Sequence, residues 1–87
     1  MLITPDEDGV RIFESYRRDK KYVAILPNGK AVHFGQRGYQ QYKDRTPLKL
    51  YSDLDHHDEK RREAYYKRHA KNYPKYSADW FSKKYLW

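Results

Sequence analysis

The sequence predicts an α+β fold, in which a three-stranded antiparallel meander is followed by C-terminal helices packed on one face of it. Two observations predict it: β-favouring runs around a Pro-Asn-Gly turn fill residues 10–34, and a helical pattern with caps and a proline fills residues 55–87. Residues 35–54 then form an irregular connection. A chain of 87 residues supports one small core, so residues 1–87 make a single domain.

The strands come first along the chain. Apolar and polar residues alternate over residues 10–16, which predicts a first strand. The runs KKYVAIL and AVHFG predict two more strands, near residues 21–26 and 30–34. Between them, Asn28 and Gly29 tolerate the positive φ values of tight turns, so the two runs are expected to form an antiparallel hairpin.

The connection begins with two glycines, Gly35 and Gly38, which permit a tight change of direction out of the sheet. A short helix over residues 39–43 is one option for the start of this connection. A long helix is then expected over residues 55–72, with Asp53 or Asp55 as its N-cap. Pro74 ends that helix, and Ser77 caps a final short one.

The long helix has an aromatic face and a cationic face when its residues are placed at 100° intervals. The aromatic face is expected to pack on the sheet. The cationic face is either ordinary solvated surface or a binding surface for a polyanion, and both interpretations stay open. The aromatic side carries Asp58, Arg62, Tyr65, Tyr66, His69 and Tyr73, and the cationic side carries Lys60, Arg61, Ala64, Lys67, Arg68 and Lys71.

The charge balance points to an anionic partner. The chain has 19 basic and 12 acidic residues, a net charge of +7, and the excess lies in residues 21–87. Such a field attracts nucleic acid, anionic lipid or an acidic protein surface. The longest apolar run, VAIL, is too short for a membrane helix, and the acidic start MLITPDEDG is unlike a signal peptide. No membrane partner is therefore expected.

Motifs for catalysis or metal binding are missing from the sequence. The absence of cysteine excludes disulfides and thiolate zinc sites. His56 and His57 lie beside two acidic residues, with His33 and His69 as further candidates, but their spacing matches no known metal pattern. No nucleophile motif, carboxylate pair or P-loop is present. We therefore expect neither an enzyme nor a metal or cofactor.

Three segments carry a family resemblance: KKYVAILPNGKAVHFGQRGYQQYKD, RREAYYKRHAKN and the Trp-rich end YSADWFSKKYLW. In this order they resemble a family of small basic proteins of large nucleocytoplasmic DNA viruses, with relatives in marseilleviruses, iridoviruses and chlorella viruses. The resemblance covers about two thirds of the chain, and RTPLKLYSDLDHH departs from it as an insertion. It implies a viral, virion-associated protein, present in the virion and in the cytoplasm or nucleus of the infected host cell.

The function that we expect is sequence-tolerant binding of double-stranded DNA through its phosphates, which would condense or organise a viral genome. Two alternatives stay open. One is a virion or capsid linker that binds other virion proteins through its aromatic end, and the other is binding of single-stranded RNA by stacking on exposed rings. The expected DNA contacts are Lys30, Arg37, Lys43, Arg45, Lys60, Arg61, Lys67, Arg68 and Lys71.

The chain ends in a cluster of large aromatic residues, which share one face of the final helix. Some of that face must pack on the sheet, but a core of this size is not expected to hold the two tryptophans as well as Tyr65, Tyr66 and Tyr73. A large uncovered apolar patch is uncommon on a monomer. A homodimer is therefore expected, and it would present two cationic helix faces to one DNA molecule. Its expected contact residues are Trp80, Phe81, Tyr85 and Trp87.

Overall fold

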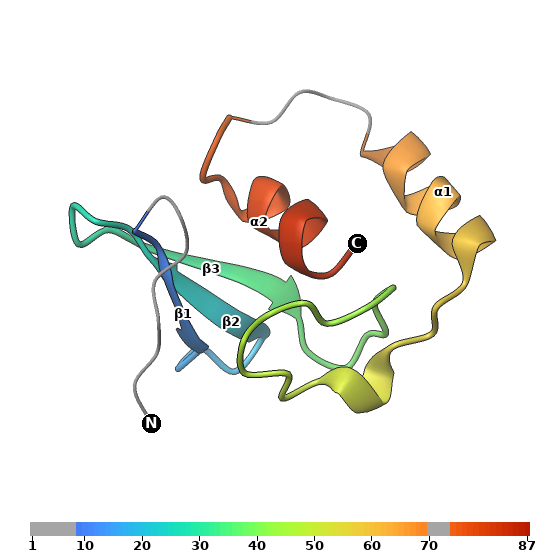
Figure 1. Cartoon of the computed structure of the whole chain (residues 1–87), viewed down its shortest axis with the longest axis horizontal. Coiled ribbons are helices and arrows are strands. Elements are labelled where there is room, and N and C mark those ends of the chain that lie inside the picture. The colour runs from blue at the N-terminus through green and yellow to red at the C-terminus, as the bar shows by residue number, and fades with distance from the viewer. Residues whose placement is uncertain (1–8, 70–73) are drawn as a thin grey trace.

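The computed structural model describes residues 9–69 and 74–87 as a three-stranded antiparallel sheet followed by two α-helices (Figure 1). The sheet is a meander, because β1 pairs with β2 and β2 pairs with β3. The predicted fold class is therefore confirmed. The elements are β1 Arg11–Glu14, β2 Lys20–Ile25, β3 Ala31–Gln36, the 3₁₀ helix η1 Ser52–Leu54, α1 Glu59–Arg68 and α2 Ala78–Tyr85.

The turn between β2 and β3 has the geometry that its residues predict. The Gly29 amide donates to the Leu26 carbonyl at 2.9 Å, and the Leu26 amide donates to the Lys30 carbonyl at 2.9 Å. Gly29 has a φ of +87°, which glycine adopts without strain. The Asn28 side chain accepts from the Lys30 amide and closes the loop. The predicted hairpin is confirmed.

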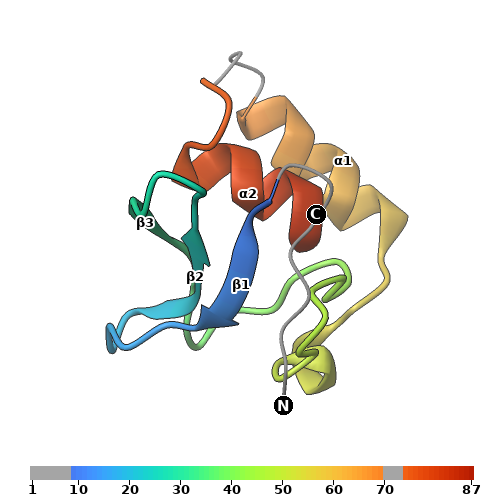
Figure 2. The same ribbon diagram turned by 60° about the vertical axis from the view of Figure 1, so that its left-hand side comes forward.

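An aromatic core joins α2 to the sheet, and in both views α2 lies between the sheet and α1 (Figures 1 and 2). Phe34 of β3 stacks on Phe81, with ring centroids 5.5 Å apart, and on Tyr85, at 6.0 Å. Large stacked rings bury much apolar surface in a small protein that has few aliphatic residues. The buried core consists of Val10, Ile12, Tyr22, Ala24, Leu26, Phe34, Phe81, Tyr85 and Leu86.

Gly35 brings the end of α2 close to β3. Its φ is +76°, and a Cβ added there would lie 2.8 Å from Leu86 Cδ1. Any other residue would strain the backbone and displace Leu86, so this glycine is required by packing. The strand β3 continues through Gly35 to Gln36, so the chain leaves the sheet later than predicted.

A buried polar network organises the connection. Residues 39–43 do not form the short helix that was one option for this segment. Gln41 forms an isolated bridge with Asp55, and its side-chain amide donates to the Asp55 carboxylate at 2.6 Å. Asp55 also accepts from the Asp44 amide at 2.7 Å. The Asp44 carboxylate in turn accepts from the Tyr22 hydroxyl at 2.5 Å. Hydrogen bonds satisfy these buried groups and fasten the connection to the sheet.

This network explains why α1 begins later than predicted. The proposed N-caps are wrong, because η1 contains Asp53 and the network holds Asp55. The N-cap is Asp58, whose carboxylate accepts from the Lys60 amide at 2.9 Å and the Arg61 amide at 3.3 Å. Residues 70–73, the predicted end of the helix, lie outside the described residues.

The cap of α2 is as predicted, because the Ser77 hydroxyl accepts from the Trp80 amide at 3.2 Å. Within residues 9–69 and 74–87, no helix has the length and apolar character needed to span a membrane.

Candidate nucleic-acid interface

The two faces of α1 have different environments. Tyr65 is buried and stacks on Trp87, with ring centroids 4.3 Å apart and planes at 2°. On the same side, the Arg62 guanidinium donates to the Trp87 carbonyl at 2.7 Å. The cationic residues of the opposite side are all exposed: Lys60, Arg61, Lys67 and Arg68. The helix therefore presents a charged outer face to solvent, defined by these four residues.

Arg62 is a cation that serves packing. Its guanidinium carbon lies 5.1 Å from the ring centre of Tyr42 and 5.3 Å from that of Tyr66. A guanidinium between two rings gains cation–π attraction and covers their apolar faces. Arg62 thus anchors α1 to the connection. On the outer face, Arg61 also contacts the connection, because its guanidinium donates to the Gln40 side-chain oxygen at 2.8 Å.

The other expected DNA contacts are scattered. Lys30 lies in the β2–β3 turn, at the opposite end of the molecule from α1 (Figure 1). Arg37 is half-buried, and its guanidinium donates to the carbonyls of Lys20 at 2.6 Å and Ser15 at 2.9 Å. These bonds tie Arg37 to the β1–β2 turn, so its charge is already engaged within the protein.

Two further expected contacts lie on the connection. Lys43 and Arg45 are both exposed, and their amides donate to the carbonyls of Leu86 and Tyr85. The Arg45 guanidinium donates to the Lys83 carbonyl at 3.1 Å. Lys71 lies outside the described residues. Only the part of the expected set that lies on α1 therefore forms a continuous charged face in the described chain.

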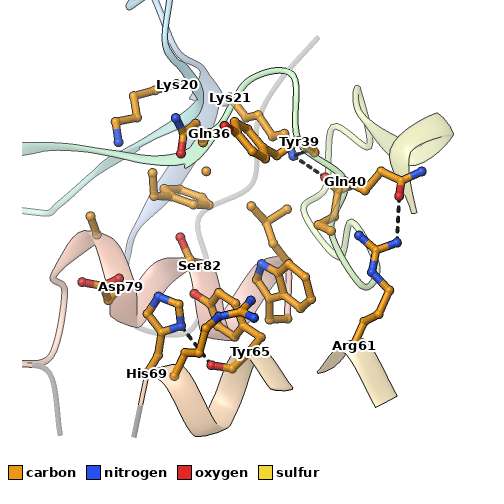
Figure 3. A pocket seen from close by; sticks show the side chains of 17 residues that line it. Lys20, Lys21, Gln36, Tyr39, Gln40, Arg61, Tyr65, His69, Asp79 and Ser82 are labelled. Atoms are coloured by element: carbon orange, nitrogen blue, oxygen red, sulfur yellow. Dashed lines mark hydrogen bonds between the residues drawn. The ribbon is translucent and has the colours of Figure 1, made fainter. Parts of the chain in front are cut away.

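A cleft of about 400 Å³ opens beside that face, where α1, α2 and the end of the sheet meet (Figure 3). Figure 3 shows Lys20, Gln36 and Tyr39 along one wall, with Tyr65 of α1 and His69, the C-cap of that helix, facing them. Arg61 and Arg68 also line it, so the cleft and the outer face of α1 share these two cations. The sequence does not predict this cleft, because its wall residues come from segments that are far apart in the chain.

Lys21 lies at the base of the cleft wall. It is 1% exposed, and its ammonium donates to the Tyr39 carbonyl at 2.6 Å and to the Gln41 side-chain oxygen. Burial lowers the pKa of Lys21 to about 8, although nearby Asp44 acts in the opposite direction. Lys21 therefore holds the loop that carries Tyr39, and it adds positive charge to the cleft below that pH.

The histidine pair at the start of α1 is spread out. His56 is half-buried, its Nδ1 accepts from the Asp58 amide at 2.9 Å, and burial lowers its pKa. His57 is exposed and lies 3.9 Å from the Asp55 carboxylate. Among the residues that the structure describes, no cluster of three or more His, Cys, Asp or Glu side chains could hold a metal ion.

The C-terminal aromatic residues differ in burial. Phe81 is 0% exposed and Tyr85 8%, and both lie in the chain's own core. They form the part of the aromatic face that packs on the sheet, since Phe34 stacks on both rings and Tyr76 stacks on Phe81. Trp80 and Trp87 are half-buried and pack against the same core. The homodimer itself stays a prediction, without Phe81 and Tyr85 as surface contacts.

Comparison with known proteins gives one family match, over part of the chain. Residues 10–47 match the model of a family of unknown function, DUF5754. The match covers the sheet and the start of the connection, less than half of the 87 residues. It includes Lys20, Lys21 and Tyr39 of the cleft but neither α-helix. No curated protein and no solved structure gives a significant match to the chain.

Proposed function

We propose that this protein binds double-stranded DNA through its phosphates, with little dependence on base sequence. The observation that carries the proposal is the exposed outer face of α1, where Lys60, Arg61, Lys67 and Arg68 lie opposite the packed side of the helix. Cations held on a rigid, outward-facing helix reach phosphates without a rearrangement of the protein. The net charge of +7 supports the same partner, since it attracts a polyanion over longer range.

The spacing of the four cations suits a phosphate backbone. They form two adjacent pairs, and seven residues of α-helix separate the pairs by about 10.5 Å along the axis. Each DNA strand offers a phosphate roughly every 3.4 Å of duplex axis, so the two pairs would contact different phosphates. Glu59 lies toward Arg62, whose guanidinium is 3.9 Å from the Glu59 carboxylate, whereas Glu63 borders the face, four residues before Lys67.

The resemblance to proteins of large DNA viruses extends the proposal to a viral genome. A small basic protein that binds phosphates without base readout would condense or organise DNA in a virion. The linker function is less well supported, because two of its four expected contact residues, Phe81 and Tyr85, are in the core. A homodimer would add a second outer face and raise the affinity through effective concentration.

Two matched double variants test the proposal. Lys60→Gln/Lys67→Gln removes two charges from the outer face, and Lys30→Gln/Lys49→Gln removes two charges elsewhere. We expect the first to weaken binding of a random-sequence duplex by on the order of tenfold or more at about 0.1 M salt, and the second much less. Fluorescence anisotropy of a labelled duplex measures both. Equal losses would mean that net charge, and no particular face, governs binding.

A further inference from the structure

The cleft beside α1 is positively charged. Lys20, Lys21, Arg61 and Arg68 line it, and Asp79 is the one carboxylate among the lining residues that the structure describes. Its volume of about 400 Å³ lies within the range of small-ligand sites in proteins. Low-dielectric walls concentrate the field of such a cluster, so the cleft attracts an anionic group of small-molecule size.

The cleft also has an aromatic wall with one accessible ring. Both faces of Tyr65 are covered, by Trp87 at 4.3 Å and by His69 at 4.1 Å between ring centroids. Tyr39, in contrast, is 63% exposed and is the most exposed ring of the lining. The hydrogen bonds of Lys21 to the Tyr39 carbonyl and of Arg61 to the Gln40 side chain hold the loop around Tyr39 in place (Figure 3).

Polar side chains complete the lining. Gln36 and Ser82 face the cleft from the sheet and from α2, and both can donate and accept hydrogen bonds (Figure 3). A ligand that satisfies all three features carries a phosphate, a flat ring and a polar ring edge. These are the parts of a nucleotide, and the cleft opens next to the face that we assign to DNA phosphates.

We propose that the cleft binds one unpaired nucleotide of a DNA strand, with its phosphate on the cationic side chains and its base against Tyr39. This inference rests on the proposed DNA binding and specifies which form of DNA the protein prefers. A paired base stays inside the duplex stack, and taking it out has an energetic cost, whereas an unpaired base is free to stack on a protein ring. Single-stranded ends or gaps next to a duplex therefore bind better than a blunt duplex.

Trp87 provides a direct signal for occupation of the cleft, because it lines the cleft and Trp80 does not. In a Trp80→Phe background, Trp87 is the only indole. Titration with a short single-stranded oligonucleotide is expected to change its fluorescence. An abasic oligonucleotide of equal length and charge is expected to bind about tenfold more weakly, since it cannot stack.

Tyr39→Leu tests the stacking ring, and its matched control is Tyr16→Leu, an exposed tyrosine that does not line the cleft. We expect Tyr39→Leu to remove the difference between the two oligonucleotides, and Tyr16→Leu to preserve it. Lys20→Gln, with the ring intact, is expected to weaken both oligonucleotides. If Tyr16→Leu acts like Tyr39→Leu, or if the abasic strand binds as well as the normal one, the inference is overturned.

Two further comparisons test the identity of the cleft's ligand and the binding of duplex DNA independently of each other. A free mononucleotide that binds as tightly as the oligonucleotide would overturn the strand as the ligand. Lys60→Gln/Lys67→Gln tests duplex binding independently, because neither residue lines the cleft. If the unmodified protein binds duplex DNA but gives no base-dependent signal, the cleft alone is refuted. If it gives the base-dependent signal but Lys60→Gln/Lys67→Gln binds duplex DNA as tightly as the unmodified protein, duplex binding by α1 alone is refuted.

Discussion

α1 and α2 both carry cationic and aromatic residues, but they use their charges differently. On α2, the Lys83 ammonium donates to the His69 carbonyl at 2.5 Å and lies 5.7 Å from the Tyr66 ring centre. Lys84 lies 5.1 Å from the ring centre of Trp80. On α1, in contrast, Lys60 and Lys67 are exposed. A lysine among aromatic residues is thus often part of the packing, and composition alone does not identify the charges that bind a partner.

The packing of the two helices differs in the same way. α2 contributes Phe81 and Tyr85 to the core under the sheet, whereas Tyr65 is the buried residue of the ten described for α1. α1 is attached through Trp87 and the connection, at the edge of the molecule (Figure 2). Such an element contributes less to global stability and is well placed to carry a surface function.

The largest expected effect comes from the core contact of α2. Phe81→Ala should lower the free energy of unfolding by about 3–5 kcal/mol, because it leaves a cavity beside Phe34. Tyr65→Ala should cost less, since Tyr65 packs on Trp87 and His69 at the edge of the molecule. Urea denaturation compares the two variants. Equal losses would contradict the distinction between a core helix and an attached helix.

Lys21 extends the comparison to a buried cation. Its pKa of about 8 lies below the value of 10.5 of a free lysine, so the unfolded chain binds more protons between these pH values. Stability should therefore rise with pH from about 8 to 10.5, relative to Lys21→Met, which cannot titrate there. The relative gain is on the order of 3 kcal/mol. Denaturation of both proteins across this range measures it, and parallel pH profiles would show that Lys21 is not buried as described.

The two N-caps offer a smaller, matched test. Asp58→Ala and Ser77→Ala each remove a side-chain acceptor from a helix start, at about 1 kcal/mol. Loss of the Asp58 cap should speed amide hydrogen exchange within α1 alone. Loss of the Ser77 cap should lower global stability, because α2 is part of the core. Faster exchange throughout the sheet in Asp58→Ala would show that α1 is integral to the fold.

The smallest effect is expected for the outer face. Lys60→Gln/Lys67→Gln should change the free energy of unfolding by less than about 0.5 kcal/mol, as surface substitutions usually do. Lys84→Gln should cost more, about 0.5–1 kcal/mol, through its lost contacts with Trp80 and Tyr85. Thermal denaturation measures the loss of stability in both variants. A larger loss in Lys60→Gln/Lys67→Gln than in Lys84→Gln would contradict the assignment of Lys84 to packing and of Lys60 and Lys67 to binding.

Local signals explain what could be predicted from the sequence. The hairpin is encoded by Pro27, Asn28 and Gly29 together with β-favouring flanks, and the Ser77 cap lies directly before its helix. Helical periodicity predicted the cationic face of α1. All four described cations of that face are exposed in the structure.

Long-range contacts explain what could not be predicted. Asp55 resembles an N-cap in sequence, but it is held by Gln41 and Asp44, many residues away. Arg37 resembles a surface cation, but two carbonyls of the β1–β2 region bind it. The cleft is formed by the sheet, the loop of Tyr39 and both helices, and no local pattern brings these together.

The salt dependence of duplex binding tests whether the outer face of α1 binds DNA phosphates. If the outer face of α1 neutralises four phosphates, the logarithm of the affinity should fall with the logarithm of salt concentration at a slope of about −3.6. Between roughly 50 and 200 mM salt, the affinity should then fall on the order of a hundredfold. Lys60→Gln/Lys67→Gln should reduce the slope by about 1.8, since two phosphate contacts are lost. A slope that is the same in both proteins would contradict phosphate binding by this face.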